Sequence, residues 1–317
     1  MMRTGRFALT LLAGCSFATG AAAADYDYEL GLAYGWGQFD GTFATIVNGV
    51  PTPSLGISTT SSDSDTIDLS GAWYYSGLSD ADGPKSRAAF LSRASSIVVG
   101  YSRGDESGSA SFTGGGNIPP VSNTFDSTSN EISVDLRHVW VDSGWYALAG
   151  VAHAELEGDS VINGAASSSE WDATAYALGV GRYLGKATTL DLSVLTLDAG
   201  GSNPTVIALT FNHVGSISET WQYGASAAYA KSDTGGDGDV FAVQGALYPS
   251  VATEFGLGFT RQESARGSDQ DAIEAFAGWF VRDHVELTAR YRTIDADSGP
   301  GEDTDSDEFG VGVSVRF

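Results

Sequence analysis

The sequence of 317 residues contains a single cysteine, Cys15, which lies in a leader that we expect to be removed. The mature chain then has no cysteine, which excludes disulfides, thiolate metal sites and cysteine nucleophiles. No apolar run approaches the roughly 18 residues that a membrane-spanning helix needs. Basic residues are also scarce, with 16 Lys and Arg against 40 Asp and Glu and a formal net charge of −24. So acidic a chain is not expected to bind the nucleic-acid backbone.

The first residues are typical of a secretory signal. Arg3 and Arg6 precede an apolar run over 7–13 and small residues that end at Ala24. We therefore predict a signal peptide at 1–24, and a single domain at 25–317 with a formal charge of −26 once both arginines are removed. An alternative stays open, because residues 12–15 resemble a lipobox that would make a lipid-bearing cysteine the first residue of the mature chain.

Proline and methionine are few as well, at 8 and 2 residues, whereas the chain has 41 glycines and 11% aromatic residues. This composition does not favour long helices. It fits many short strands spaced by Gly and Ala with aromatic residues at their ends, so we predict an all-β fold.

Apolar and polar residues alternate along almost the whole mature chain, as they do in strands that separate two environments. An even number of such strands would return the chain to the side where it began, as an up-and-down antiparallel barrel in a membrane requires. We predict about 14 strands, within a range of about 12 to 16: Tyr26–Phe39, Thr66–Tyr75, Ser96–Arg103, Asn130–Val141, Trp145–Glu157, Trp171–Leu184, Thr188–Leu197, Thr205–His213, Trp221–Ser232, Val240–Tyr248, Thr253–Gln262, Ala272–Phe280, Val285–Ile294 and Glu308–Phe317.

The connections between these strands alternate in length. Long ones, expected to be extracellular loops, cover 40–65, 104–129, 158–170, 199–204, 233–239, 263–271 and 295–307, and short ones, expected to be periplasmic turns, lie between them. The link Ser76–Ser95 breaks this rule with twenty residues that include Gly83, Pro84 and three basic side chains. It holds a short helix, or else the third strand begins earlier.

Charged residues indicate which face of each strand points to lipid. A charge near the membrane midplane costs about 2–4 kcal/mol on the lipid side, whereas a charge in the lumen is hydrated or paired. Aromatic residues, including all seven tryptophans, are expected in girdles at the membrane interfaces. The side chains predicted to line the pore are Asp68, Asp135, Arg137, Glu254, Glu274, Glu286, Arg290, Arg292 and Arg316.

The last nine residues alternate strictly and end on an aromatic residue. This ending resembles the assembly signal of Gram-negative outer-membrane β-barrel proteins, which Gly312, Val315 and Phe317 match, although Gly310 stands where a polar residue is usual. The resemblance implies a protein of the Gram-negative outer membrane, in contact with its lipids and lipopolysaccharide and inserted by the barrel assembly machinery. The last strand is expected to pair with Tyr26–Phe39 and close the barrel.

About fourteen strands enclose more space than side chains can fill, so we expect a lumen unless a loop folds inward. Gly and Ala on the inner faces indicate an open bore, or only relief of crowding where strands bend. The resemblance to general porins implies that lumen arginines and carboxylates face each other across the bore. Pairing between neighbouring strands within the wall is the alternative.

The predicted function is passive diffusion of small hydrophilic solutes or ions, without a cofactor or a metal. One alternative is a barrel without transport, whose acidic loops bind lipopolysaccharide, divalent cations or an external partner. A hydrolase ranks third. Its one candidate base is His153, expected to face inward near Glu155, and no serine motif accompanies it. The chain is therefore not expected to be an enzyme.

Overall fold

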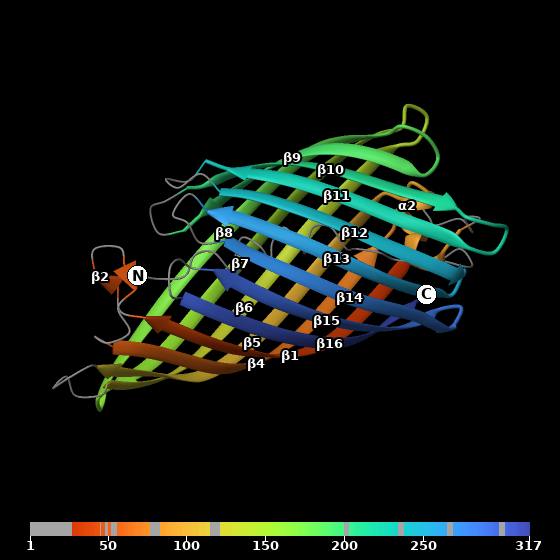
Figure 1. Cartoon of the computed structure of the whole chain (residues 1–317). Helices are drawn as coiled ribbons and strands as arrows, with labels where there is room; N and C mark the ends of the chain where they lie inside the picture. Colours follow the sequence, from red (N-terminus) through yellow and green to blue (C-terminus); the bar gives the residue numbers. More distant parts are fainter. Residues whose placement is uncertain are drawn as a thin grey trace.

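The strands close into one antiparallel barrel in which β1 (Tyr28–Ala44) pairs with both β4 (Gly56–Trp73) and β16 (Glu302–Arg316) (Figure 1). This computed structural model describes residues 27–317 except 45, 48–49, 52–55, 77–82, 115–120, 200–202, 234–237, 265–268 and 298–301. The predicted signal peptide and the alternative lipobox lie outside the described residues. Among the described residues, no helix is long and apolar enough to cross a membrane.

Fourteen strands form the barrel wall, as predicted: β1 (Tyr28–Ala44), β4 (Gly56–Trp73), β5 (Ser96–Gly114), β6 (Val121–Trp140), β7 (Trp145–Ile162), β8 (Ala165–Tyr183), β9 (Thr188–Asp198), β10 (Thr205–Ser216), β11 (Gln222–Ser232), β12 (Gly238–Ser250), β13 (Thr253–Ser264), β14 (Asp269–Arg282), β15 (Val285–Asp297) and β16 (Glu302–Arg316). Two short strands, β2 (Ile46–Val47) and β3 (Val50–Pro51), pair only with each other.

The wall is taller on one side than on the other. Strands β4 to β8 have 18 to 20 residues each, whereas β9 to β16 have 11 to 15, and Figure 1 shows the longer strands extending well past the shorter ones. Much of 40–65, 104–129 and 158–170, predicted to be loop, is therefore strand. These stretches are polar on both faces, so they lack the apolar alternation by which a strand is recognised, but their backbones pair in register all the same.

Both chain ends of the barrel lie at the same opening, called here the terminal end, and the opposite opening is called the loop end. At the terminal end Tyr28 and Phe317 exchange two backbone hydrogen bonds, each 3.0 Å long, and their rings stack. From there β1 and β16 remain in register from Glu29 opposite Arg316 to Phe43 opposite Glu302. The predicted closure of the last strand onto the first is thus confirmed.

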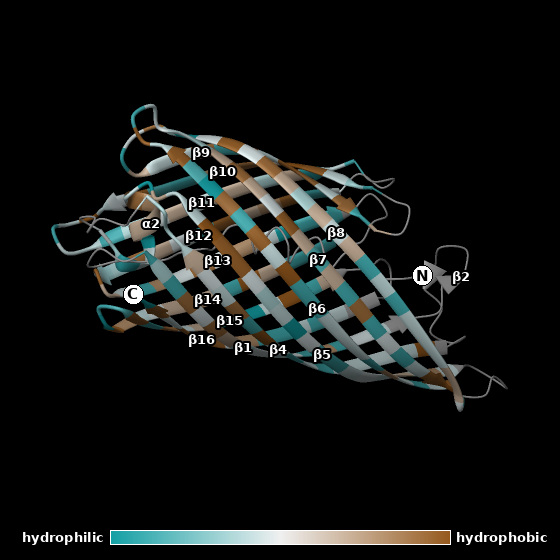
Figure 2. Ribbon diagram, turned by 180° about the vertical axis from the view of Figure 1, so that it is seen from behind, coloured by the Kyte–Doolittle hydropathy of each residue, from teal (hydrophilic) through white to brown (hydrophobic). Residues whose placement is uncertain are grey.

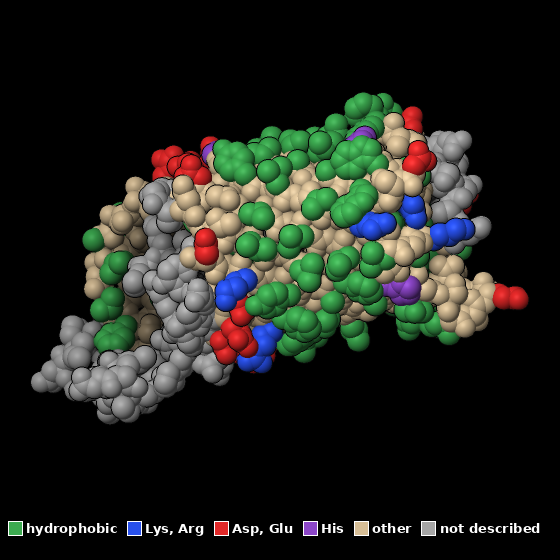
Figure 3. Space-filling model, turned by 90° about the horizontal axis from the view of Figure 1, so that it is seen from above, with side chains coloured by type: hydrophobic (Ala, Val, Ile, Leu, Met, Phe, Trp, Pro, Cys, Tyr) green, Lys and Arg blue, Asp and Glu red, His purple; other side chains and the backbone are tan. Residues whose placement is uncertain are grey.

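The outer face carries a continuous belt of exposed apolar side chains. On β1, for example, Leu30 and Leu32 are each about half exposed, while the alternate residues point inward. Figure 2 shows the resulting alternation of hydrophobic and hydrophilic residues along the strands, and Figure 3 shows hydrophobic side chains across the middle of one face with charged ones towards its ends. A belt of this size is unfavourable in water and favourable in lipid.

Six of the seven tryptophans are exposed on the outer face: Trp36, Trp73, Trp140, Trp145, Trp221 and Trp279. Trp171 is the exception to the predicted girdles. It shares its face of β8 with the buried residues Ala173 and Ala175, whereas the exposed Tyr176 is on the other face. Strand alternation therefore places Trp171 on the inner face.

Candidate functional site: the lumen and its terminal end

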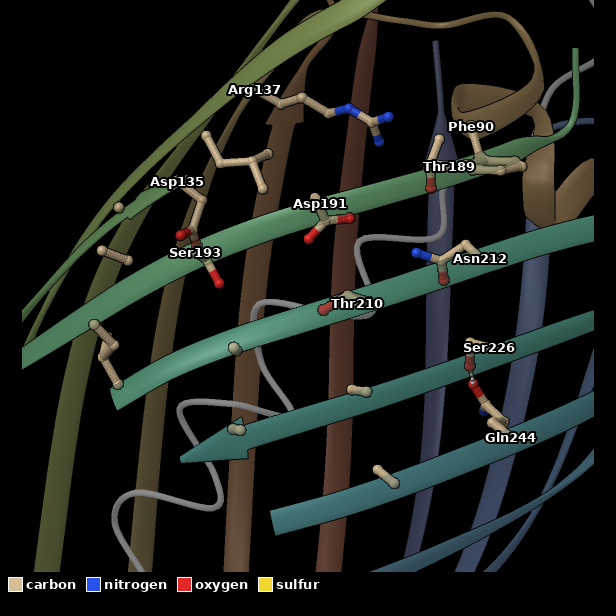
Figure 4. Close-up of a pocket in the computed structure, with 18 of the residues that line it drawn as sticks. Phe90, Asp135, Arg137, Thr189, Asp191, Ser193, Thr210, Asn212, Ser226 and Gln244 are labelled. Atoms are coloured by element: carbon tan, nitrogen blue, oxygen red, sulfur yellow. Dashed lines mark hydrogen bonds between the residues drawn. The ribbon is translucent and has the colours of Figure 1, made fainter. Parts of the chain in front are cut away.

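The lumen contains a cavity of about 390 Å³. Its wall comes from the inner faces of strands β5 to β15. At the terminal end it is bounded by residues that include Arg87 and Phe90, from the link between β4 and β5. Figure 4 shows Asp135 and Arg137 projecting into it, with Asp191 and Ser193 on β9 and Thr210 and Asn212 on β10. The charged residues that line it are Arg87, Asp135, Arg137, Asp191, Glu274, Arg290 and Arg292.

The nine residues predicted to line the pore are all on the inner face, but they lie in three different places. Five of them, Asp135, Arg137, Glu274, Arg290 and Arg292, line the cavity, and Asp68 is on the inner face of β4. The remaining three are buried on the inner face near the terminal end, at 8% exposure or less: Glu254, Glu286 and Arg316. Alternation fixes the face of a strand that a residue occupies, but not its depth in the barrel.

The arginines pair with carboxylates of neighbouring strands. Arg290 on β15 lies 3.9 Å from Glu274 on β14, and Arg292 on β15 lies 3.7 Å from Glu308 on β16. Among the described residues, the lumen ion pairs therefore join neighbouring strands within the wall and do not cross the bore. This is the alternative of the two interpretations of the sequence, and not the one that the resemblance to general porins implied.

Arg137 is held by aromatic rings. It donates a hydrogen bond of 2.7 Å to the Tyr183 hydroxyl and its guanidinium lies 4.6 Å from the centre of the Tyr146 ring. Tyr146 in turn donates to Asp191 over 2.8 Å. Sequence analysis missed Asp191 as a lining residue, although it is the only charged residue of its strand at an inward position and could have been found by alternation.

Glycines on the inner face have two different roles. At Gly181 a Cβ atom would overlap the ring of Tyr146, and at Gly256 it would overlap the ring of Phe276. These two glycines accommodate aromatic rings that lie across them. They therefore relieve crowding on the inner face and do not indicate an open bore. At Gly35 the neighbours of a Cβ would lie at ordinary contact distances, the nearest 3.4 Å away.

A short helical segment crosses the terminal end. Residues 83–95, called here the crossing segment, contain a 3₁₀ turn, η2 (Lys85–Arg87), and one turn of α-helix, α2 (Ala88–Leu91). Of the two alternatives for this link, the structure shows the short helix, and the next barrel strand, β5, begins at Ser96 and not earlier. Pro84 precedes it with a φ of −60°, and Arg93, with a φ of +56°, ends it in the left-handed region, while the Ala94 amide bonds back to the Ala89 carbonyl.

Hydrogen bonds tie the crossing segment to the far wall. Arg87 Nε donates to the Tyr248 hydroxyl on β12 over 2.8 Å, and the Lys85 amide donates to the Val251 carbonyl in the turn after β12. Strand β12 is seven strands away from β5, where the segment joins the wall, in a ring of fourteen. The segment therefore extends from one side of the opening to the opposite side.

Other contacts hold the segment to the turns around the opening. Arg93 donates to the Val141 carbonyl over 3.3 Å and to the Gly185 carbonyl over 2.8 Å, while Lys85 Nζ contacts the Asp283 carboxylate at 2.6 Å. Phe90 packs against the Tyr183 ring, whose hydroxyl donates to the Phe90 carbonyl. Each basic residue of the segment thus has a partner in a different part of the rim, and the segment narrows the terminal end.

Beside it, the seam between β1 and β16 is closed by a buried arginine. The side chain of Arg316 has no exposed area, and it lies 2.9 Å from Glu29 on β1 and 3.3 Å from Glu286 on β15. Its guanidinium also lies 4.4 Å from the centre of the Phe280 ring. One side chain on β16 therefore joins both neighbouring strands.

The ion pair between Lys85 and Asp283 makes one anchor of the crossing segment sensitive to acid. The hydrogen bond and the charge of Lys85 hold the pKa of the Asp283 carboxyl below its ordinary value of 3.8. The pair therefore stabilises the folded state above that pH, and its contribution is lost as the pH falls through the lowered pKa. We expect Asp283→Asn to lower the urea midpoint of unfolding at neutral pH, by an amount that shrinks towards zero in strong acid.

Asp142→Asn, in another turn at the terminal end, is the matched control and should shift the midpoint little at any pH. If Asp283→Asn lowers the urea midpoint by the same amount at pH values well below 3.8 as at neutral pH, the charge of this carboxylate does not anchor the segment.

His153 lies on the outer face, contrary to the predicted inward orientation. It shares its face of β7 with the exposed Val151, whereas Ala152 and Ala154 are buried on the inner face. Its ring lies 3.0 Å from the Thr174 hydroxyl and 3.5 Å from Glu155. Catalysis was not predicted for this chain, and that expectation stays a prediction. Among the described residues, no group of three or more His, Cys, Asp or Glu is arranged to hold a metal ion.

Neither a protein-family model nor a curated protein matches the sequence. Solved structures with a similar fold include the outer membrane protein Omp33 of Acinetobacter baumannii, at 14% identity and a TM-score of 0.52, covering 92% of this chain and 99% of that one. A FadL homologue of Pseudomonas aeruginosa has 10% identity and a TM-score of 0.52, and the TodX monoaromatic hydrocarbon channel has 10% and 0.53, each covering 92% of this chain and 90% of its own. At these identities the likeness concerns the fold.

Proposed function

We propose that this protein is an outer-membrane channel for the passive diffusion of small hydrophilic solutes or ions. The observation that carries the proposal is a closed barrel with an apolar belt outside and a cavity inside whose lining includes charged and polar side chains. The fold shared with bacterial outer-membrane proteins and the signal-like leader support this location. In that membrane the terminal end faces the periplasm, because both chain ends lie there, and insertion requires the barrel assembly machinery.

Cations are the favoured ions. Asp68, Glu131 and Asp135 occupy the inner faces of β4 and β6, and none of the ion pairs formed by described residues includes them. The lumen arginines, in contrast, lie beside carboxylates or aromatic rings. Uncompensated carboxylates on the wall raise the local concentration of cations.

Neutralising two of these carboxylates should reduce cation selectivity. A full charge about 8 Å from a hydrated ion contributes about 0.5 kcal/mol at the dielectric constant of water, and screening in roughly 0.1 M salt about halves this value. Because the charge attracts potassium and repels chloride, the two contributions add to about 0.5 kcal/mol, or about a factor of two in their permeability ratio. We expect Glu131→Gln with Asp135→Asn to lower the ratio of potassium to chloride permeability by about fourfold, measured as the reversal potential in a salt gradient. Asp126→Asn, on the outer face of the same strand, is the matched control, and an equal effect of the control would remove these two carboxylates from the conducting path.

The crossing segment favours a second candidate, a barrel without transport. A barrel narrowed at one end could instead present its tall side, which carries exposed acidic residues on the outer faces of β4 to β7, to lipopolysaccharide, divalent cations or an external partner. Planar-bilayer recordings distinguish the two functions, because the second predicts a correctly folded barrel that carries no current with the segment present or absent.

A further inference from the structure

One side of the lumen wall is apolar where a pore for ions alone would be polar. Val206 and Ala208 on β10 and Ala230 on β11 form a buried cluster, against which Leu195 of β9 and Val240 of β12 pack. These five residues are called here the apolar patch. All but Val206 line the 390 Å³ cavity, so the patch belongs to the wall that a solute meets.

The apolar patch is distinct from the apolar groups that hold the crossing segment. Two other clusters serve that purpose: Ala88, Ala89 and Ala94 pack with Tyr74, and Phe90 packs against Val139, Tyr146 and Tyr183. Among the described residues, the patch and the residues packed against it include no member of the crossing segment. Anchoring that segment therefore does not explain the patch.

Three carboxylates lie on the inner faces of β4 and β6. Asp68 on β4 is opposite Ser102 on β5, which in turn is opposite Glu131 on β6, and Asp135 follows Glu131 two inward positions further along that strand. Asp68, Glu131 and Asp135 are called here the acidic wall. Strand β4 is seven strands from β11 in the ring of fourteen, and β6 is six strands from β12, so the acidic wall lies across the ring from the part of the apolar patch on β11 and β12.

This pairing of surfaces matches one class of solute. An apolar body would displace water from the patch, and a cationic head would lie towards carboxylates that no described basic residue neutralises. The 390 Å³ cavity, which Asp135 of the acidic wall lines together with the patch, falls within the range of roughly 300–1,000 Å³ usual for sites that bind small organic molecules.

We propose that the lumen binds small amphipathic organic cations, with their apolar part on the apolar patch and their ammonium or guanidinium group towards the acidic wall. The inference rests on the proposed function for the route by which such a solute reaches the site. Binding itself requires no conduction, so the two can fail separately. Inorganic cations and small neutral solutes would pass the same site without being retained.

The test is calorimetric titration of the folded barrel in lipid nanodiscs, with empty nanodiscs as the blank. Three probes separate the contributions: hexyltrimethylammonium has both the head and the body, tetramethylammonium has the head alone, and hexanesulfonate has a similar body with the opposite charge. We expect hexyltrimethylammonium to bind about tenfold tighter than tetramethylammonium, the factor that burial of about two methylene groups supplies. Hexanesulfonate should bind more weakly than hexyltrimethylammonium.

Two sets of variants assign the effects to the two surfaces. Leu195→Asn with Val240→Thr should remove most of the advantage of hexyltrimethylammonium over tetramethylammonium, because it makes the patch polar at similar volume. Asp68→Asn, Glu131→Gln and Asp135→Asn together should remove the preference over hexanesulfonate. Asp126→Asn should change neither, and heat-modifiable migration on gels checks that every variant is folded.

Equal binding of hexyltrimethylammonium and tetramethylammonium, or of the cationic and anionic six-carbon probes, would overturn the inference. If the probes bind as expected but planar bilayers carry no current, the binding site stands and the proposed channel function fails. If currents flow and the probes do not discriminate, the channel stands and the amphipathic site is wrong.

Discussion

Replacing residues 84–94 with a Gly-Ser linker of equal length should raise solute flux through the barrel several-fold. In the structure this segment reaches from β5 to β12 and is fixed by Arg87 to Tyr248, by Lys85 to Asp283 and by Arg93 to two backbone carbonyls. A linker without these side chains loses all of these side-chain anchors and leaves the opening to solvent. The measurement is the rate of swelling of proteoliposomes in isotonic sugar solutions of increasing size.

The linker variant keeps Ser76 and Ser95, because the Ser95 amide donates to the Ser76 hydroxyl and the Ser95 hydroxyl accepts from the Val139 amide. These contacts maintain the wall where β4 leaves it and β5 rejoins it. A linker of Gly and Ser at the loop-end turn 163–164 is the matched control and should leave the swelling rate unchanged. If the folded linker variant swells no faster than the wild type, the crossing segment does not limit flux.

Removing Arg316 should be the most destabilising single substitution in the barrel wall. Arg316→Met leaves Glu29 and Glu286 facing each other without the cation between them, and breaking a buried ion pair in this way costs about 3–5 kcal/mol. Because Arg316 joins β16 to both β1 and β15, the loss falls on the seam that closes the barrel. Urea unfolding followed by tryptophan fluorescence measures the change in the free energy of unfolding.

Two companions make this result specific to the charge arrangement. Arg292→Met breaks a more exposed pair with Glu308 and should cost less than about 1 kcal/mol. The triple change Glu29→Gln, Glu286→Gln and Arg316→Met removes all three charges and should recover most of the lost stability. An Arg316→Met variant as stable as Arg292→Met would show that the seam does not depend on this residue.

The strand count and the inner and outer faces could be predicted because the chemistry of this wall repeats every two residues. Leu30, Leu32 and the last strand around Val313 follow one rule, since lipid outside and water inside act on alternate side chains. The rule fails for the parts of β4 to β8 near the loop end, where residues such as Ser62 and Asp63 are polar on both faces of the strand. There the pairing of backbones, which leaves no periodic mark in the sequence, decides where the strand ends.

The crossing segment could be located but not interpreted. Residues 76–95 were conspicuous as an over-long link with Lys85, Arg87 and Arg93 in a strongly acidic chain. That these three cations anchor to Asp283, to Tyr248 and to the carbonyls of two turns depends on contacts between positions up to 198 residues apart, which periodicity cannot reveal. The depth of Glu254, Glu286 and Arg316 was hidden for a similar reason, because it follows from strand tilt and register.

Single-channel recording of the folded protein in planar bilayers, with the segment-replacement variant beside the wild type, tests most directly whether the lumen is a conducting path. We predict discrete current steps that prefer cations, small in the wild type and several-fold larger when residues 84–94 are replaced by the linker. A folded replacement variant that carries no current would contradict the proposal, because no described segment would then cross the terminal end and the lumen itself would have to be non-conducting.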